Sequence, residues 1–532
     1  MKKRITFLLL AAMLIGSLAG CGNNSQNEAP GSDAAVTQSG GEETQTQKEE
    51  TGSGDVGSED IYEIVMIIPT LGTEPAGLAD VEEAVNAIVE PELGVNISLY
   101  PIFIYDLTSQ TNLMLQSGDK LDLLISFVTG VGSYVSKDAI MPLDDLYAQY
   151  GQEIEKAEGV ALAGGYYNGQ LYAIPSEEKH ARSYGFFART DILNELGFEV
   201  SKDEVYTLED LTELFTAYKE KYGEGYYCVA GTSATTELYS NIHELDVLGA
   251  GISTGVLTGG GLDGDSTVKN LYESPEYEAY AQQMYEWAQA GFFSPDASTN
   301  TDAGTIQVQS GYYLGQFSST ETDMESNLSR DCGYDMTAIN LVAPYASTSM
   351  YMVSMWSVPT NCENPEKVFR FLNMLYGDNE IANILTNGLK DVTYEVVEEG
   401  ERPGQMVVHY AEGVDAANAP YIMPLHVFGD KLNIAVFEPM SLDYYTLAEE
   451  FNAGLPDSRK SLSLGYVFNS ESVAAQRSAV EAVVQQYSGI VATGAQDPSS
   501  VLPQFQKALR DAGIEDIIVE NQTQLDQWLS EQ

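Results

Sequence analysis

The sequence predicts an α/β fold, because apolar runs typical of strands alternate along it with helical spacings of apolar residues. Residues 61–68 are rich in β-branched and aromatic side chains and end at Pro69. Apolar residues then recur with the spacing of one helix face at Val81, Ala84, Val85 and Ile88. A strand-like run, a helical stretch and another strand-like run follow at residues 95–104, 107–115 and 121–125. This order predicts a mostly parallel sheet with helices on both faces.

Helical patterns also mark the second half of the chain. One apolar face runs from Tyr277 to Ala288 and stops before Gly291, and a second includes Val480, Val483 and Val484. A shorter pattern covers residues 502–509 and closes at Gly513. Glycine after the last apolar residue is a common end for a helix. We expect these faces to pack in the core.

Ligands of parallel α/β sheets bind at the carboxyl ends of the strands. Residues 70–73 and 126–134 follow two of the predicted strands and are therefore expected to border a cleft. Thr70 offers a hydroxyl there, while Phe127 and Tyr134 offer flat rings on which a ligand can stack. The alternative for both rings is packing in the core.

The N-terminus has the pattern of an export signal. A basic triplet at residues 2–4 precedes an apolar run at residues 5–15, which is too short to span a bilayer. The run ends in LAGC at residues 18–21, which resembles the lipobox of bacterial lipoproteins. This resemblance implies a signal peptide at residues 1–20 and acylation, for example by palmitate, of Cys21, which anchors the chain to the membrane.

Residues 21–60 contain almost no large apolar side chain and are rich in Ser, Thr, Gln, Gly and Glu. Such a composition buries too little surface to offset the entropy of ordering, so we predict a disordered tether. The remainder of the 532-residue chain is long enough for two domains with sizeable cores. A formal net charge of -54 argues against nucleic acid as a partner, because phosphates are repelled.

Several motifs in a common order resemble family 1 extracellular solute-binding proteins of ABC sugar importers. They are DLLIS at 122–126, MPLDD at 141–145, NGQLYAIP at 168–175, YGFFARTDIL at 184–193 and NPEKVFRFL at 364–372. The C-terminal stretch resembles the LipO-type lipoprotein subgroup through LGYVF at 464–468, LPQF at 502–505 and QLDQW at 524–528.

The resemblance implies a two-lobe periplasmic-binding-protein fold of type II, with a ligand cleft between lobes joined by crossing hinge strands. Lobe 1 is expected at residues 61–182 plus about 352–430, and lobe 2 at 183–351 plus about 431–532. The LipO-type region is expected at about 390–532.

The resemblance implies that the protein captures a carbohydrate, expected to be an oligosaccharide, by closure of the lobes and delivers it to the permease subunits of an ABC importer. We expect a monomer that needs no cofactor, no metal and no catalysis. The alternatives are a binding protein for peptides or another polar nutrient, or a surface lipoprotein glycosidase with two catalytic carboxylates.

Carbohydrate binding needs aromatic faces together with planar hydrogen-bonding groups. Candidates near the first crossing follow the motif at 168–175, and Trp356 belongs to a segment that resembles the second crossing strand. A tryptophan there either stacks on ligand or fills the core. The full set of candidate ligand-binding residues is Thr70, Phe127, Tyr134, Glu177, His180, Arg182, Tyr184, Tyr313, Gln316 and Trp356.

Catalytic and metal sites have little support in the sequence. The four histidines show no HExxH spacing, and there is no GxSxG motif, so zinc hydrolysis and serine esterase chemistry are disfavoured. Residues 296–302 carry oxygen ligands at alternate positions but lack the glycine and glutamate of a calcium loop. Besides Cys21 the chain has Cys228, Cys332 and Cys362, which we expect to be free buried thiols or at most one disulfide.

Overall fold

The computed structural model describes residues 61–532, except residues 73, 128–129, 177–178, 232–237, 322–323, 417, 424 and 426. The predicted signal peptide, the tether, Cys21 and Glu177 therefore lie outside the described residues. Within the described part, no helix combines the length and the hydropathy that a membrane span requires.

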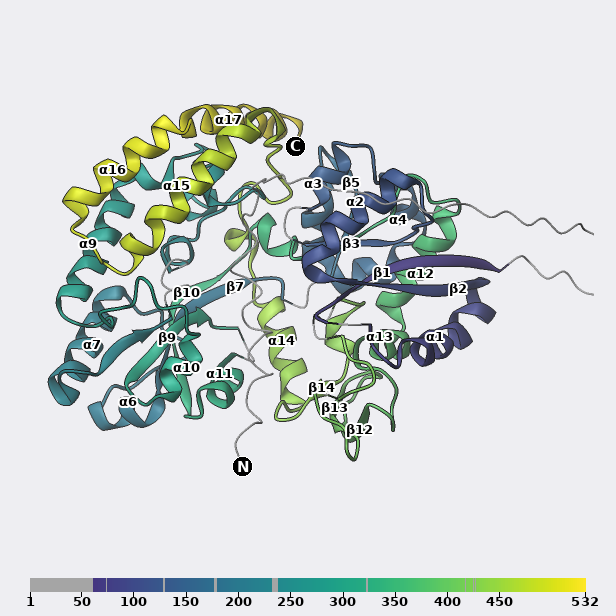
Figure 1. The fold of residues 1–532 in the computed structure, drawn as a ribbon, viewed down its shortest axis with the longest axis horizontal. Coiled ribbons are helices and arrows are strands. Elements are labelled where there is room, and N and C mark those ends of the chain that lie inside the picture. The colour runs from purple at the N-terminus through teal and green to yellow at the C-terminus, as the bar shows by residue number, and fades with distance from the viewer. Residues whose placement is uncertain are drawn as a thin grey trace, which may run out of the picture. The chain divides into compact units, whose positions relative to one another are not determined.

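The first sheet contains the N-terminal strands (Figure 1). β1 (Tyr62–Thr70) pairs in parallel with β2 (Val95–Phe103) over its whole length. A parallel bridge between Met66 and Leu123 places β3 (Leu124–Phe127) on the other side of β1. β11 (Ser354–Ser357) then lies antiparallel between β3 and β6 (Ile174–Pro175). The helices of this part are α1 (Leu78–Leu93), α2 (Leu107–Ser117), α3 (Gly130–Val135), α4 (Asp144–Tyr150), α5 (Gln152–Glu158), α12 (Pro365–Gly377) and α13 (Asn379–Asn387).

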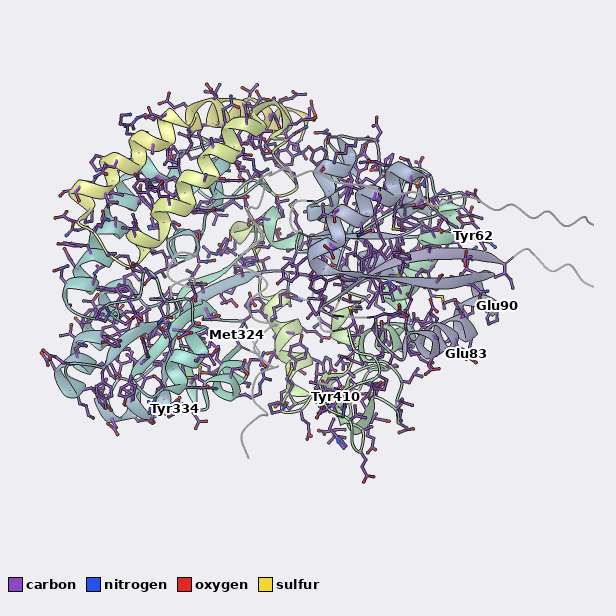
Figure 2. The ribbon with its side chains drawn as sticks, in the orientation of Figure 1. Tyr62, Glu83, Glu90, Met324, Tyr334 and Tyr410 are labelled. Carbon is purple, nitrogen blue, oxygen red and sulfur yellow. The ribbon has the colours of Figure 1, made fainter. Side chains whose placement is uncertain are left out.

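Local sequence signals explain where these helices begin and what they bury. The predicted helix after β1 is confirmed as α1, in which Val81 and Val85 are buried. α12 begins at the NPE motif, where the Asn364 side chain accepts a 3.2 Å hydrogen bond from the Lys367 N–H and Pro365 takes the first helical position. The outer faces are acidic: Figure 2 shows Glu83 and Glu90 on α1, and both are exposed.

The second sheet has the strand order β10-β7-β9-β8. β7 (Arg182–Arg189) lies antiparallel to both β10 (Met336–Tyr345) and β9 (Tyr313–Ser319), and β8 (Tyr227–Ala230) lies parallel to β9. The expectation of a mostly parallel sheet is therefore right for β1–β3 and wrong here. For β7 and β10 the reason is that β7 begins and β10 ends at the connections to the first sheet, so the two strands run in opposite directions.

Close strand approach in this sheet requires glycine at one position of β9. A Cβ on Gly315 would lie 1.9 Å from the Phe187 carbonyl oxygen of β7, which no side chain tolerates. The helices packed around the sheet are α6 (Thr190–Leu196), α7 (Leu208–Tyr222), α9 (Pro275–Gln289), α10 (Gly304–Gln309) and α11 (Met324–Cys332) (Figure 1).

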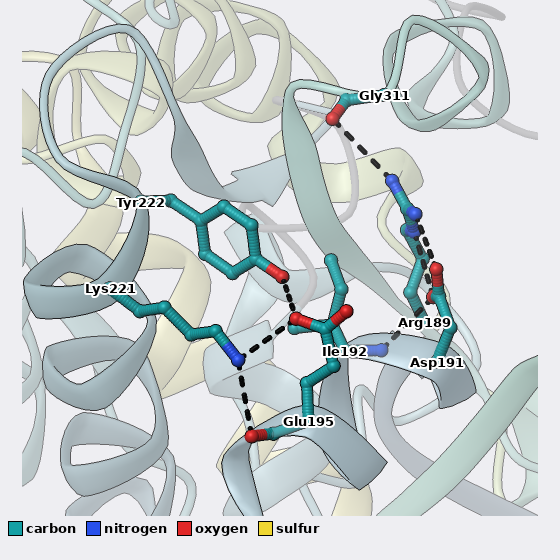
Figure 3. A network of polar contacts seen from close by, with 7 residues as sticks. All are labelled: Arg189, Asp191, Ile192, Glu195, Lys221, Tyr222 and Gly311. Carbon is teal, nitrogen blue, oxygen red and sulfur yellow. Dashed lines mark hydrogen bonds and ion pairs between the residues drawn. The ribbon is translucent and has the colours of Figure 1, made fainter.

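A polar network fixes the outer end of β7 (Figure 3). The Arg189 guanidinium donates to both carboxylate oxygens of Asp191, at 2.6 and 3.1 Å, and holds the pKa of that carboxyl below its ordinary value. The same guanidinium lies 3.7 Å from the centre of the Tyr334 ring. Beside it, Lys221 and Tyr222 both contact the Glu195 carboxylate, at 2.9 and 2.7 Å. These contacts join α6, α7 and β7, and their role is structural.

The C-terminal helices pack on the second part of the chain. α15 (Ala474–Ala492), α16 (Pro498–Asp511) and α17 (Ile514–Glu531) contact one another, and α15 and α16 also contact α9 (Figure 1, yellow). Phe505 and Leu525 are fully buried in the same core as Phe186 and Trp287. The helices predicted near residues 480–487 and 502–509 are thereby confirmed.

Two large hydrophobic cores accompany the two sheets, one containing residues between 64 and 174 and between 355 and 434, the other residues between 184 and 345 and between 466 and 525. Smaller elements connect or extend them: β4 (Tyr166–Tyr167), β5 (Gln170–Leu171), β12 (Tyr394–Glu399), β13 (Met406–Tyr410), β14 (Val436–Phe437) and α14 (Asp443–Ala453). The described cysteines, Cys228, Cys332 and Cys362, are free and buried, as expected.

Candidate ligand-binding site

The carboxyl ends of β1 and β2 lie side by side, because the two strands are paired from first residue to last. Thr70 ends β1 and is the register partner of Phe103, which ends β2. The Thr70 hydroxyl donates a 3.2 Å hydrogen bond to the Gly72 carbonyl oxygen, and its residue is mostly buried. Phe127 ends β3 and is half-buried. Both predicted residues therefore lie at the edge of the sheet where ligands of α/β proteins bind.

Three exposed aromatic residues at the end of β2 were absent from the sequence-based prediction. Tyr100, Phe103 and Tyr105 are 48, 38 and 56 % exposed, and Tyr312, at 53 %, is the one other described aromatic residue with comparable exposure. The rings of Phe103 and Tyr105 contact each other edge to face, with centroids 5.1 Å apart and planes inclined by 61°. The alternation of buried residues along β2 assigns Tyr100 to the outer face, and this signal is readable from the sequence.

The chain passes between its two sheets through two short segments, the first crossing segment (residues 176–181, between β6 and β7) and the second crossing segment (residues 346–353, between β10 and β11). The first residue of the first crossing segment, Ser176, is bonded to Ser354 of β11, which directly follows the second crossing segment. The Ser176 N–H donates to the Ser354 carbonyl oxygen at 3.1 Å, and the Ser354 hydroxyl donates to the Ser176 carbonyl oxygen at 3.2 Å. The two passages are thus held side by side where they leave the first sheet.

His180 lies in the first crossing segment and contacts two other parts of the chain. Its carbonyl oxygen accepts a 2.6 Å hydrogen bond from the Tyr351 hydroxyl of the second crossing segment. Its N–H donates a 2.8 Å hydrogen bond to the Asn452 side chain of α14. Burial lowers the pKa of the His180 imidazole to about 4, because a charged ring loses its hydration there. The ring is therefore neutral at physiological pH.

An ion pair ties the first crossing segment to the end of β9. The Lys179 ammonium lies 3.4 Å from the Glu321 carboxylate, and both side chains are more than four-fifths buried. Such a pair holds the segment beside the second sheet, because separating the two groups leaves a largely buried charge without this partner.

Four of the predicted residues belong to the second sheet. Arg182, half-buried, begins β7 opposite Tyr345, and Tyr184 is buried two residues further along the same strand. Tyr313 and Gln316 lie on β9 and are also mostly buried, and Gln316 is the register partner of Phe187. The structure therefore gathers these residues on two adjacent strands, and their binding roles stay predictions.

Tyr134 and Trp356 lie in the core of the first sheet. The Trp356 ring has no exposed surface, its Nε1–H donates a 2.8 Å hydrogen bond to the Val427 carbonyl oxygen, and it stacks on Phe428 at 5.8 Å. Tyr134 is 3 % exposed, and burial raises the pKa of its hydroxyl. For both residues this placement favours packing over ligand contact, the two roles that the sequence left open.

The chain passes a third time between the cores through α14 and the residues after it. Asp246 stabilises the end of this passage. Its buried carboxylate accepts hydrogen bonds from the hydroxyls of Ser461 at 2.5 Å and Ser463 at 2.6 Å, both of which follow α14. Close by, the Arg459 guanidinium donates to both carboxylate oxygens of Glu244, at 2.5 and 3.1 Å.

An open hollow of about 890 Å³ lies elsewhere, between α1, α13 and the β12–β13 hairpin. Its lining includes Ile88, Asn383 and Tyr394, and none of the predicted ligand-binding residues. The crossing segments and the ends of β1 and β2 do not contribute to it, so we do not assign the ligand to this hollow.

Comparison with known proteins gives two family matches. Residues 83–394, more than half of the chain, match the family described as bacterial extracellular solute-binding protein. Residues 462–530 match a domain of unknown function, DUF3502. The second match begins at the segment held by Asp246 and covers α15, α16 and α17. It coincides with the predicted LipO-type C-terminal motifs.

The chain is 23 % identical over 462 residues to a carbohydrate ABC transporter substrate-binding protein of Streptococcus pneumoniae, covering 86 % of this chain and 90 % of that one. The N-glycan transport solute-binding protein NgtS of S. pneumoniae matches with a TM-score of 0.73 at 22 % identity, over 88 % of this chain and 99 % of NgtS. Structures of NgtS with Man1GlcNAc and Man5GlcNAc match over the same shares, with TM-scores of 0.63 and 0.61.

A solute-binding protein of Bifidobacterium longum infantis described as binding HMO matches with a TM-score of 0.63 at 15 % identity, over 88 % of this chain and 99 % of that one. These neighbours share the two-lobe type II fold, and the predicted fold class is confirmed. The family is one of binding proteins that act outside the cytoplasm, and the chain belongs to it: this is a bacterial extracellular solute-binding protein with a C-terminal DUF3502 domain.

Proposed function

We propose that this protein captures an oligosaccharide outside the cytoplasm and delivers it to the permease subunits of an ABC importer. The observation that carries the proposal is the similarity, over nearly nine-tenths of the chain, to carbohydrate-binding relatives, two structures of which hold glycans. The exposed aromatic residues at the end of β2 add the flat apolar surfaces that pyranose rings need.

Binding works by a shift between conformations rather than by chemistry. A ligand that contacts both lobes only in the closed form favours that form by the difference between its two affinities. The crossing segments at residues 176–181 and 346–353 are the connections that such a movement bends. The importer then distinguishes the loaded protein from the empty one by its conformation.

The chain acts as a monomer tethered to the membrane through an acylated Cys21. The basic triplet, the short apolar run and LAGC at residues 18–21 support this part of the proposal. Residues 21–60 serve as the tether, and their polar composition suits a flexible connection to a membrane partner. One acylated residue carrying more than one chain gives stable attachment, whereas a single chain binds reversibly.

A thermal-shift screen tests the ligand class. The panel contains Man1GlcNAc, Man5GlcNAc, kestose and maltotriose beside single amino acids and tripeptides. A ligand that binds only the folded state raises the melting temperature, and the rise grows with the logarithm of the ligand concentration relative to its Kd. At least one oligosaccharide is expected to do so. Stabilisation by peptides alone refutes the carbohydrate assignment.

A further inference from the structure

The aromatic surface at the end of β2 consists of Tyr100, Phe103 and Tyr105. Its rings are exposed, whereas most other described aromatic rings are not. Large aromatic rings gain free energy when they leave water, and nearly all described ones in this chain are buried or half-buried. Three of the exposed ones fall within six consecutive residues. A local concentration of exposed apolar surface marks a place where something binds.

Contacts between the rings of Phe103 and Tyr105 preorganise this surface for binding. Phe103 and Tyr105 hold each other edge to face at 5.1 Å, which restricts the rotation of both. Phe103 ends a strand, and Tyr105 lies in the short helical turn η1 (Ile104–Asp106) that leads into α2. The backbone that carries them is therefore ordered on both sides, and a ligand meets rings that lose little freedom on binding.

The position is the carboxyl end of a parallel strand pair, beside Thr70 in the register. The exposed Asp106 ends the same turn and brings a carboxylate, which accepts hydrogen bonds from hydroxyl groups. Aromatic faces beside a carboxylate match a ligand with an apolar C–H face and a rim of hydroxyls. A purely apolar partner makes no use of the carboxylate, and an anionic ligand is repelled by it.

From this juxtaposition we infer that Phe103 and Tyr105 form a stacking subsite for one pyranose ring of the bound oligosaccharide, with Asp106 as an acceptor for its hydroxyls. The inference rests on the proposed function and specifies where one sugar unit sits. The carboxyl edge of β2 thus contributes binding energy through ring faces, independently of the residues on the crossing segments.

Paired substitutions distinguish the contribution of the flat aromatic face from that of an apolar side chain in general. Phe103→Leu and Tyr105→Leu keep an apolar side chain but remove the flat face, whereas Phe103→Tyr and Tyr105→Phe keep the ring. Val519→Ala, at an exposed position on α17, is the distant control. Each protein is titrated calorimetrically with the four oligosaccharides named above, and its melting temperature is measured without ligand.

The expected result is that each leucine variant loses roughly tenfold or more in affinity for the sugar that the unmodified protein binds, while the ring-preserving variants and Val519→Ala stay within about threefold. Melting temperatures without ligand stay the same, because the substituted side chains are exposed. Wild-type affinity in both leucine variants overturns the subsite, and so does an equal loss in the ring-preserving variants. If the unmodified protein binds none of the sugars, the proposed function itself fails and the subsite fails with it.

Discussion

The Tyr351 hydroxyl donates a 2.6 Å hydrogen bond to the carbonyl oxygen of His180, and this bond joins the two crossing segments between the sheets. Tyr351 has no exposed surface, and His180 is half-buried. The bond bears on the proposed closure, because a movement of one lobe against the other would bend both segments.

Tyr351→Phe removes only this hydroxyl. We expect the free energy of unfolding to fall by about 1 kcal/mol, because the carbonyl oxygen of the half-buried His180 loses this donor. Amide exchange in peptides covering residues 176–181 and 346–353 is expected to become faster. Tyr172→Phe is the matched control, because its hydroxyl makes an exposed local bond to Gln170. Unchanged exchange in both peptides would show that the bond does not couple the segments.

His180 makes stability depend on pH in a predictable direction. Its pKa is about 4 in the folded chain, and an unfolded histidine has an ordinary value of about 6.5. As the pH falls below about 6.5 the unfolded state takes up the proton first, so the histidine's contribution to stability decreases and is lost fully below about 4. The largest loss is roughly 3 kcal/mol. In the His180→Gln variant, the unfolding free energy should differ less between pH 7 and pH 4.5 than in the unmodified protein, as measured by denaturation at both pH values. An unaltered difference contradicts the lowered pKa of His180.

Trp356 is predicted to stabilise the first core rather than touch ligand. Trp356→Ala leaves a large cavity and is expected to cost about 3–5 kcal/mol of unfolding free energy. Trp356→Phe keeps most of the stacking on Phe428 but removes the donor to Val427, and should cost less while leaving sugar affinity within about twofold. Urea denaturation and calorimetric titration of the phenylalanine variant check this. If the Trp356→Phe variant kept its full stability but lost sugar affinity, Trp356 would instead be a residue that stacks on the ligand.

Asp246 is predicted to hold the start of the DUF3502 region. Asp246→Ala removes the acceptor for the buried hydroxyls of Ser461 and Ser463 and for the Leu248 N–H, which is expected to cost about 2–4 kcal/mol. Limited proteolysis should then cut near residue 461 sooner than in the unmodified protein. Asp457→Asn is the control, because its ion pair with Lys460 is exposed. Equal effects of the two substitutions would refute a special role for Asp246.

Cys21 is the predicted site of acylation. Cys21→Ser leaves no thiol for the modification, so the variant should incorporate no labelled palmitate and should leave the membrane fraction of the cells. Cys228→Ser, at a buried thiol of the second core, should incorporate label normally. Labelled Cys21→Ser protein would place the anchor elsewhere.

Much of the fold could be predicted because local patterns determine it. The spacing of Val81 and Val85 gave α1, and Asn364 before Pro365 gave the start of α12. The antiparallel pairing of β7 with β10 and β9 could not be predicted, because strand direction depends on how the chain returns between the sheets. Helical and strand periodicities carry no information about that return.

The candidate site was harder to predict for a physical reason. A ring such as Tyr184 or Trp356 has the same local pattern whether it packs in a core or faces a ligand, and the structure places both in cores. The sequence did not single out Phe103 and Tyr105 as binding residues. Whether a ring at the end of a strand is exposed depends on which other segments pack against it, and local sequence patterns do not give that packing. The alternation of apolar and polar residues along that strand is a signal by which the outward position of Tyr100 could have been predicted.

Native mass spectrometry distinguishes an oligosaccharide-binding protein from a peptide-binding protein and from a glycosidase in a single experiment. The purified protein is mixed with equal concentrations of Man5GlcNAc, kestose and two tripeptides, and the masses of the complexes and of the free ligands are recorded together. We expect a complex of one protein chain with one intact oligosaccharide, and free sugars of unchanged mass. A complex with peptide alone, or the appearance of shortened sugars, would contradict this expectation.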